Sequence, residues 1–207
     1  ADEVFVSDGA KSDSGNIQEI FAQDNKIAVC DPVYPVYVDS NVMAGRTGTY
    51  DADTQMWSDV IYMPCTSDNN FVPELPKETP DVIYLCLPNN PTGTYINGSK
   101  IEEFIRKVHE KAARLHPDDD QDVVVVVDEA YYEYVDDPTH YSMIEMVQKG
   151  YDRPLIVQRT FSKAYGLAGL RIGYAITQPA LADAIMKACQ AWNYSGPGLL
   201  ACETALD

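Results

Sequence analysis

Five consecutive valines, Val123 to Val127, restrict the fold of this chain more than any other feature. Valine is branched at Cβ and favours an extended backbone. An unbroken apolar run of this length is typical of a strand that is covered on both faces, and such strands occur mostly in parallel sheets between two layers of helices. Asp128 and Glu129 follow the run directly, so the strand is expected to end at a polar edge.

Short apolar runs alternate with helical patterns along the rest of the chain. Strands are expected at Val4–Ser7, Lys26–Asp31, Val60–Pro64, Val82–Leu87, Val123–Asp128, Leu155–Arg159 and Arg171–Thr177. Helices are expected at Asn16–Ala22, Pro35–Met43, Ser99–Leu115, Ser142–Lys149, Pro179–Ala191 and from Gly198 onward. Residues 45–58 and 64–80 are polar and rich in turn-forming residues, as in surface loops. The alternation predicts an α/β protein, a three-layer α/β/α sandwich with a mostly parallel sheet.

The charge balance argues against several classes of partner. The 32 acidic residues outnumber the 15 basic ones, which leaves a net charge of −17. Nucleic acid and anionic lipid both need clustered Lys and Arg, so neither is expected to bind. No run reaches the ~18 apolar residues of a membrane span. Five cysteines without a CxxC pattern indicate reduced structural thiols in a cytoplasmic protein.

A lysine in a Gly-rich connection, Lys163, is the first candidate for chemistry. It follows two hydroxyl residues, Thr160 and Ser162, and precedes Arg171 by eight positions. A lysine in such a turn is usually only solvated. Hydroxyls and a guanidinium group nearby are suited to binding phosphate, however, and a lysine beside them is suited to forming a Schiff base. The combination points to pyridoxal 5'-phosphate (PLP).

Polar residues after other strands fit the same cofactor. A carboxylate at a buried strand end, Asp128, can bond a protonated pyridine nitrogen, and Tyr131 can donate to a phenolic oxygen. The alternatives are a helix cap for Asp128 and ordinary packing for Tyr131. Asn90 lies in a turn-forming segment, Pro88–Gly93, and is a second candidate for the phenolic oxygen. These residues follow predicted strands, and ligands of parallel sheets bind beyond the carboxyl ends of the strands.

Two further segments add candidates at strand ends. Ala10 and Lys11 lie in a short segment that follows a predicted strand and precedes a predicted helix, and small residues at a helix N-terminus can present backbone N–H groups to a phosphate. Tyr34 is the aromatic residue expected against the pyridine ring, whereas Tyr37 is interpreted as packing. The histidines, His109, His116 and His140, have no metal-ligand spacing, so all three are interpreted as non-catalytic and no metal site is expected.

Taken together, these motifs closely resemble the fold-type-I, class I/II PLP-dependent aminotransferases, and the resemblance spans nearly the whole chain. It implies that Lys163 bonds covalently to the cofactor, that Asp128 pairs with the pyridine nitrogen and that Tyr34 stacks on the ring. The remaining implied contacts are Asn90 and Tyr131 at the phenolic oxygen, and Ala10, Lys11, Thr160, Ser162 and Arg171 at the phosphate. Asn193 would lie near the phosphate across the interface of a homodimer.

The two halves of the chain resemble different branches of this family. Residues 1–94 resemble LL-diaminopimelate aminotransferases, notably at Ser7–Lys11 and Phe71–Pro76. Residues from about 95 onward resemble histidinol-phosphate aminotransferases, notably at Val127–Tyr134 and Thr160–Tyr174. A divergent member and a hybrid with a junction near residue 95 both remain open. The substrate is therefore expected to be LL-diaminopimelate, with histidinol phosphate as the alternative.

Members of this family are roughly twice as long as this chain. Residues 1–207 are expected to be the large, cofactor-binding domain, without the N-terminal arm and the small domain. The expected reaction is transamination between an amino acid and an oxo acid, with 2-oxoglutarate or glutamate as the second substrate. A non-catalytic PLP-binding or dimerisation domain is one alternative, and a PLP-dependent lyase or decarboxylase is another.

Overall fold

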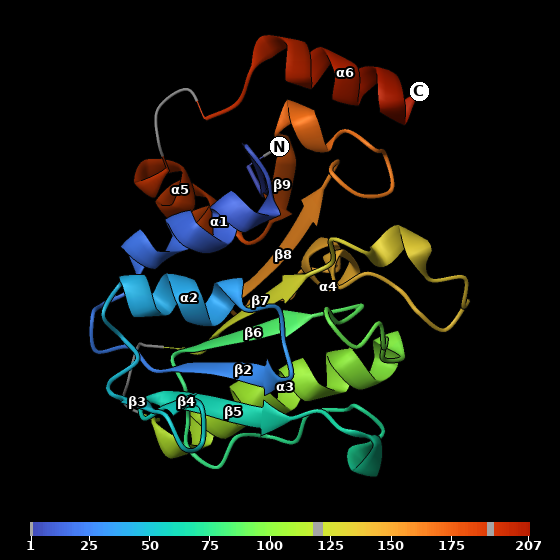
Figure 1. Cartoon of the computed structure of the whole chain (residues 1–207). Coiled ribbons are helices and arrows are strands. Elements are labelled where there is room, and N and C mark those ends of the chain that lie inside the picture. The colour runs from blue at the N-terminus through green and yellow to red at the C-terminus, as the bar shows by residue number, and fades with distance from the viewer. Residues whose placement is uncertain (1, 118–121, 190–192) are drawn as a thin grey trace.

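A seven-stranded sheet forms the centre of the molecule (Figure 1). The computed structural model describes residues 2–117, 122–189 and 193–207. From one edge of the sheet to the other the strands are β1 (Val4–Ser7), β9 (Gly173–Ile176), β8 (Leu155–Thr160), β7 (Val124–Asp128), β6 (Val82–Cys86), β2 (Ile27–Asp31) and β5 (Val60–Pro64). Each of these strands overlaps a range predicted from the sequence.

The sheet is mostly parallel, as the sequence predicts. Strands β5, β2, β6, β7 and β8 pair in parallel, whereas β9 pairs antiparallel with both β8 and β1. The valine strand β7 lies between β6 and β8, and its residues 125–127 are fully buried. Because β9 runs in the opposite direction, its first residue lies at the same edge of the sheet as the last residues of its neighbours.

Helices cover both faces of the sheet (Figure 1). One face carries α1 (Ala10–Asn16), α2 (Val36–Met43) and α5 (Pro179–Ala188), and its core includes Tyr37, Tyr84 and Ile185. The other face carries α3 (Gly98–Leu115) and α4 (Ile144–Gln148), and its core includes Phe104 and Met146. The predicted three-layer α/β/α sandwich is therefore confirmed.

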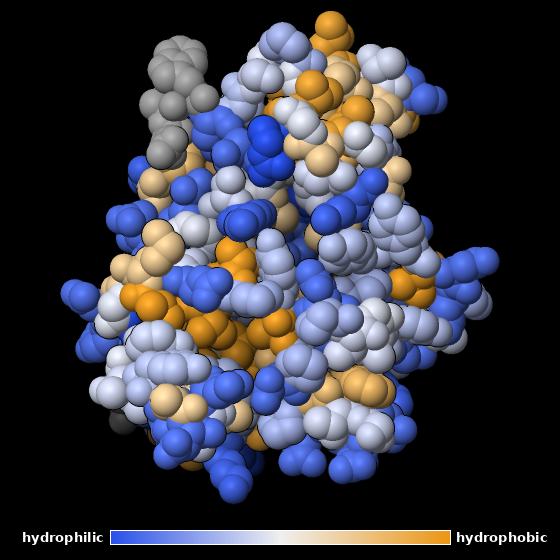
Figure 2. Space-filling view, in the orientation of Figure 1, coloured by the Kyte–Doolittle hydropathy of each residue, from blue (hydrophilic) through white to orange (hydrophobic). Residues whose placement is uncertain are grey.

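The last helix, α6 (Gly196–Leu206), packs at the β9 side of the molecule. Cys202 and Leu199 contact Phe161 and Ile172 in a small apolar cluster. The outer side of α6 carries two exposed leucines, Leu200 and Leu206, beside exposed polar residues. Figure 2 shows apolar side chains among those over this helix and a second apolar area lower on the same face, with hydrophilic side chains around both.

The longest helix, α3, shows how local sequence determines where a helix begins and which face it buries. The Asn97 side chain accepts a hydrogen bond from the Ser99 backbone N–H at 2.9 Å, which caps the first turn. Apolar residues then recur at helical spacing and are buried against the sheet: Ile101, Phe104, Ile105, Val108 and Ala112. The buried stripe matches the periodicity that predicted the helix.

One predicted helix, Asn16–Ala22, is wrong. The α-helix there is α1, which ends at Asn16, and the next residues form a 3₁₀ turn at Ile17–Ile20. The apolar spacing of Ile17 and Ile20 belongs to this turn, in which Ile17 is fully buried. Helix α1 itself packs through polar residues, Asp13 and Ser14, so it has no apolar stripe that a periodicity search could detect.

The two turn-rich segments contain small elements that were not predicted. A hairpin of β3 (Tyr50–Asp51) and β4 (Met56–Trp57) lies in residues 45–58, and a 3₁₀ turn at Ser67–Asn69 lies in residues 64–80. All five cysteines carry free thiols, four of them buried, as expected for structural cysteines. Among the described residues, no helix combines the length and the apolar character that a membrane span requires.

Candidate active site

The carboxyl edge of the sheet gathers the residues that the sequence singles out. β2, β6, β7 and β8 end there, β1 leads into α1 there, and β9 begins there. A cavity of about 260 Å³ opens at this edge. Its lining includes ten of the eleven predicted cofactor-binding residues: Ala10, Lys11, Tyr34, Asn90, Asp128, Tyr131, Thr160, Ser162, Lys163 and Arg171. Six separate chain segments thus meet in one place.

Asp128, the last residue of β7, is the buried acid of the cavity, with 6% of its surface exposed. Its Oδ1 accepts a hydrogen bond from the Ala130 backbone N–H at 2.9 Å, and its Oδ2 accepts one from the Tyr37 hydroxyl at 2.6 Å. Burial raises the pKa of Asp128, while these two hydrogen bonds and the positive charge of Lys163 act to lower it. The charge on this carboxyl group therefore depends on its neighbours.

Lys163 lies in the turn after β8, and its Nζ is 5.1 Å from the centre of the Tyr131 ring. The backbone N–H of Gly166 donates to the Lys163 carbonyl at 2.9 Å, and Gly166 has a φ of 67°, which favours glycine. This turn aims the amine at the cavity that also holds Asp128. Lys163 is exposed to solvent.

The predicted phosphate site is built from two segments that approach very closely. A Cβ atom on Gly9 would lie 2.8 Å from Nη2 of Arg171, and a Cβ atom on Gly173 would lie 2.7 Å from Cα of Gly9. Glycine at both positions lets the start of α1 sit directly beside the Arg171 guanidinium. The first N–H groups of a helix have no partner within the helix, so they and the guanidinium present donors to the same space.

Hydroxyl groups after β8 complete this donor set. The Thr160 Oγ1 accepts a hydrogen bond from the Ser162 backbone N–H at 3.1 Å and donates to the Ile172 carbonyl at 3.4 Å. Arg171 has a φ of 54° and donates from Nη1 to the Ala168 carbonyl at 3.2 Å. These contacts hold the hydroxyls and the guanidinium along one wall of the cavity.

The loops after β2 and β6 form the opposite wall. The Asn89 side chain donates from Nδ2 to the Pro32 carbonyl at 3.0 Å, which ties the loop of Asn90 to the loop of Tyr34. Tyr34 is held edge-on to Tyr37, with ring centres 5.8 Å apart and an interplanar angle of 86°. Asn90 and Tyr34 both line the cavity.

The donor set fits the cofactor that the sequence predicts. Cationic and N–H donors near Arg171 suit a phosphate, the Asp128 carboxylate suits a pyridinium nitrogen, and the Lys163 amine suits an aldehyde. Asn90 and Tyr131 offer an amide and a hydroxyl group to a phenolic oxygen. The ring of Tyr34 offers an aromatic face.

Tyr37 is a site residue that the sequence reasoning missed. The sequence predicts that Tyr37 only packs, and it does pack: its ring lies parallel to that of Tyr84, with centres 5.0 Å apart and an angle of 13°. Its hydroxyl, however, bonds Asp128 directly. A signal was available in the sequence, because a buried tyrosine hydroxyl usually finds a polar partner. The identity of that partner required the structure.

Asn193 is the one predicted residue that does not line the cavity. Its side chain is half-buried, and its Nδ2 is buried without a hydrogen-bond partner among the residues that the structure describes. The expected contact is with a cofactor across a dimer interface, so this assignment stays a prediction.

Beneath the cavity, α1 carries a second buried acid, Asp13, of which 1% is exposed. Its Oδ2 accepts a hydrogen bond from the Ser7 hydroxyl at 2.7 Å. Burial, and to a smaller extent the negative charges of Asp8 and Asp128, raise the pKa of Asp13 to about 7. Asp13 is therefore partly protonated near neutral pH.

A buried ion-pair network supports the turn of Tyr131 from the other face of the sheet. Glu129 accepts hydrogen bonds from Nε of Arg159 at 2.8 Å and from the Ser142 hydroxyl at 2.6 Å. Arg159 also pairs with Glu133 at 3.0 Å, and its guanidinium carbon lies 3.8 Å from the centre of the Tyr132 ring. The residues on either side of Tyr131 are thus fixed by charge-assisted contacts.

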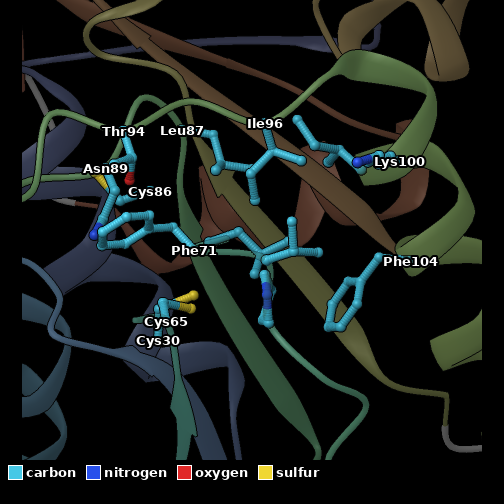
Figure 3. A pocket seen from close by; sticks show the side chains of 14 residues that line it. Cys30, Cys65, Phe71, Cys86, Leu87, Asn89, Thr94, Ile96, Lys100 and Phe104 are labelled. Carbon is cyan, nitrogen blue, oxygen red and sulfur yellow. The ribbon is translucent and has the colours of Figure 1, made fainter. Parts of the chain in front are cut away.

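A second pocket lies beside the cavity and is mainly apolar (Figure 3). The thiols of Cys30 and Cys65 lie close together in it, with Phe71 and Phe104 among the other lining residues. None of the predicted cofactor-binding residues line this pocket. It belongs to the apolar core between the sheet and α3.

Comparison with known proteins identifies the class. A mostly parallel α/β sheet with a lysine, an acid and a phosphate-type donor set at its carboxyl edge is the architecture of a cofactor-dependent enzyme domain. The family model of aminotransferase class I and II matches residues 1–207. This chain therefore belongs to the class I and II aminotransferase family.

Two relatives with about half of their aligned residues identical to this chain share one name. The chain is 51% identical over 177 residues to an LL-diaminopimelate aminotransferase of Lachnospira eligens, and 52% identical over 182 residues to one of Agathobacter rectalis. These alignments cover 85% and 87% of this chain, but 41% and 42% of the relatives. The chain thus spans about two fifths of the length of these relatives. Because the alignments span 177 and 182 residues, the similarity to LL-diaminopimelate aminotransferases continues past residue 94, where the sequence begins to resemble the other branch.

Solved structures share the fold. An LL-diaminopimelate aminotransferase from Chlamydomonas reinhardtii is 32% identical, with a TM-score of 0.77 over 97% of this chain and 50% of that one. A histidinol-phosphate aminotransferase from Sinorhizobium meliloti, solved with pyridoxal 5'-phosphate, is 25% identical, with a TM-score of 0.74 over 99% of this chain and 50% of that one.

Proposed function

We propose that this chain binds PLP and forms the cofactor-binding part of an aminotransferase. The observation that carries the proposal is the meeting of ten predicted residues around one cavity at the carboxyl edge of the sheet. Membership of the class I and II aminotransferase family supports it. So does the bound PLP named for the Sinorhizobium meliloti structure.

In this proposal each residue has a distinct role. Arg171, Thr160, Ser162 and the first N–H groups of α1 bind the phosphate, and Tyr34 packs against the ring. Asp128 holds a proton on the pyridine nitrogen through its negative charge, while Asn90 and Tyr131 bond the phenolic oxygen. When bound, PLP supplies an electron sink for negative charge at the substrate Cα. The Lys163 amine would hold the cofactor through its aldehyde carbon, and as a free amine its Nζ would take the proton from the substrate Cα.

For the amino-acid substrate we propose LL-diaminopimelate, with 2-oxoglutarate as the second substrate. The names of relatives that share half of their aligned residues with this chain support this choice. Histidinol phosphate is the second candidate, because the Sinorhizobium meliloti structure that matches 99% of the chain carries that name.

The first test is the visible absorbance of the chain titrated with PLP. The wild type is expected to gain a band from the bond between PLP and Lys163, and Lys163→Ala is expected to lack it. Lys187→Ala is the control, because Lys187 lies on the surface in an ion pair with Asp183. A band that survives in Lys163→Ala, or is absent from all three proteins, would overturn the proposed function.

The substrate is tested on the PLP-loaded protein by a half-reaction. LL-diaminopimelate, L-histidinol phosphate and glutamate are each added, and formation of pyridoxamine phosphate is followed. Conversion by LL-diaminopimelate at a rate well above that of histidinol phosphate is expected. The reverse order would favour the second candidate, and conversion by neither would leave a PLP-binding domain without turnover.

A further inference from the structure

The acid proposed for the pyridine nitrogen is held by a tyrosine from another element. The hydroxyl of Tyr37, in the first turn of α2, donates to Oδ2 of Asp128 at 2.6 Å. Tyr37 is fully buried, and Asp128 is nearly so. A hydrogen bond to a charged acceptor in a dry site is among the stronger ones in proteins.

The ring of Tyr37 has little freedom to move. It stacks in parallel on Tyr84, 5.0 Å away, and meets the Tyr34 ring edge-on at 5.8 Å. Tyr34 and Tyr37 are three residues apart, so one short segment brings one ring to the cavity wall and the other to the acid beneath. The hydroxyl of Tyr37 is thereby presented to Asp128 in a fixed direction.

We infer that Tyr37 is a positioning residue for the cofactor: its hydroxyl orients the Asp128 carboxylate and keeps it ionised. The inference rests on the proposed function, because Asp128 is the group assigned to the pyridine nitrogen. A protonated Asp128 would lose its attraction for a pyridinium group. The tyrosine therefore acts on the cofactor through the acid.

The electrostatic surroundings of Asp128 support this role. The groups around it are Tyr37 on α2, Cys86 on β6, Asp13 on α1 and Lys163 after β8. Burial raises the pKa of Asp128, and among the contacts that act to lower it the Tyr37 hydrogen bond is the strongest. Asp13 adds a negative charge nearby when it ionises, and this charge disfavours the ionised form of Asp128. Among the residues that the structure describes, removal of the Tyr37 hydroxyl would leave only the Ala130 N–H and Lys163 to favour the ionised form.

Tyr37→Phe tests the inference, with Tyr84→Phe as the matched control. Both changes remove one buried hydroxyl from the same stacked pair, but the Tyr84 hydroxyl bonds Gln18 rather than Asp128. Tyr37→Phe is expected to weaken PLP binding by about tenfold to a hundredfold, the usual effect of losing a hydrogen bond to a charged group. Tyr84→Phe is expected to change it by less than about threefold.

The pH profile separates this role from a merely structural one. With a higher pKa on Asp128, PLP binding to Tyr37→Phe should begin to weaken at a higher pH than binding to the wild type as the pH is lowered, because the acid takes up a proton. The wild type and Tyr84→Phe should lose binding together, at lower pH. Equal affinities and equal pH profiles for the two variants would overturn the inference.

A measurement without cofactor separates this inference from the proposed function. The Asp128 carboxyl resonance is followed by carbon NMR in ¹³C-aspartate-labelled protein and assigned with Asp128→Asn. The pH at the midpoint of the Asp128 titration should be higher in Tyr37→Phe than in the wild type. An unchanged midpoint would overturn the inference even if PLP binds. A raised midpoint in a chain that shows no Lys163-dependent absorbance would retain the Tyr37–Asp128 coupling and overturn the proposed function alone.

If Tyr37→Phe does not fold, replacement of Tyr37 by 3-fluorotyrosine keeps the ring and the hydroxyl. Fluorination makes the hydroxyl a stronger donor, so the Asp128 midpoint should move in the opposite direction, to lower pH. An unchanged midpoint in this variant would also overturn the inference.

Discussion

At the scale of single residues, the negative charge on Asp128 is expected to affect the rate of amino transfer more than the affinity for PLP. Asp128→Asn keeps the shape of the side chain but removes its negative charge. Amino transfer by the loaded protein should fall by about a hundredfold to a thousandfold, as for the loss of one electrostatic stabiliser. The Lys163-dependent absorbance should persist at saturating PLP, because Lys163 is untouched.

The control for that change is Asp136→Asn, which removes an exposed acid from the neighbouring cleft. Its half-reaction rate should remain close to that of the wild type. Full activity in Asp128→Asn would contradict the role given to the acid.

Asp13 leads to a prediction about stability and pH. Its pKa is about 7 in the folded chain and near the ordinary 3.8 when unfolded, so the folded state holds the proton more tightly. Between these two values the free energy of unfolding should fall as the pH rises, by up to about 1.4 kcal/mol per pH unit. Well above pH 7 this contribution no longer changes.

Chemical unfolding at pH 5 and pH 7 measures the effect. Asp13→Asn cannot ionise, so its stability relative to the wild type should increase by about 2–3 kcal/mol between these values. Asp24→Asn, an exposed surface change, should show no such trend. A wild type and an Asp13→Asn variant with parallel pH profiles would show that Asp13 does not titrate in this range.

At the scale of elements, the close approach of β9 to α1 is the feature on which the phosphate site depends. A Cβ atom on Gly173 would lie 2.7 Å from Gly9 Cα and 2.9 Å from the Ala10 nitrogen. Gly173→Ala should therefore push the two segments apart, lower stability by about 1–3 kcal/mol and weaken PLP binding. Calorimetry and the PLP titration measure the two effects.

Gly169→Ala is the matched control, because nothing lies within 4 Å of a Cβ atom at that position in the neighbouring turn. It should leave both stability and PLP affinity close to the wild-type values. Equal effects of the two substitutions would show that crowding at Gly173 does not determine the site.

Elements also show where sequence reasoning succeeds and where it stops. The strands were predictable because their apolar runs are bounded by turn residues, and the site followed because strand ends meet at one edge. α1 was misplaced because its buried face is polar, with Asp13 and Ser14 in place of an apolar stripe. The role of Tyr37 was missed because its partner, Asp128, is 91 residues away.

At the scale of the whole molecule, the net charge of −17 has a consequence for stability. Dispersed like charges repel one another and disfavour the compact state, and salt screens this repulsion over distances of about 10 Å at 0.1 M. Several surface ion pairs join residues four apart on a helix, such as Lys149 with Glu145, and pairs of this kind add little. The repulsion among the acidic surface charges should therefore outweigh the attraction within the surface ion pairs, although salt weakens both.

The melting temperature is accordingly expected to rise between 20 mM and 500 mM NaCl. A gain of about 1 kcal/mol corresponds to about 2–4 °C for a chain of this size. Sucrose at matched osmolality serves as the control, because it stabilises by exclusion from the surface without screening charge. A fall of the melting temperature with NaCl would show that exposed ion pairs, such as Lys26–Glu78, contribute more than the repulsion of the whole surface.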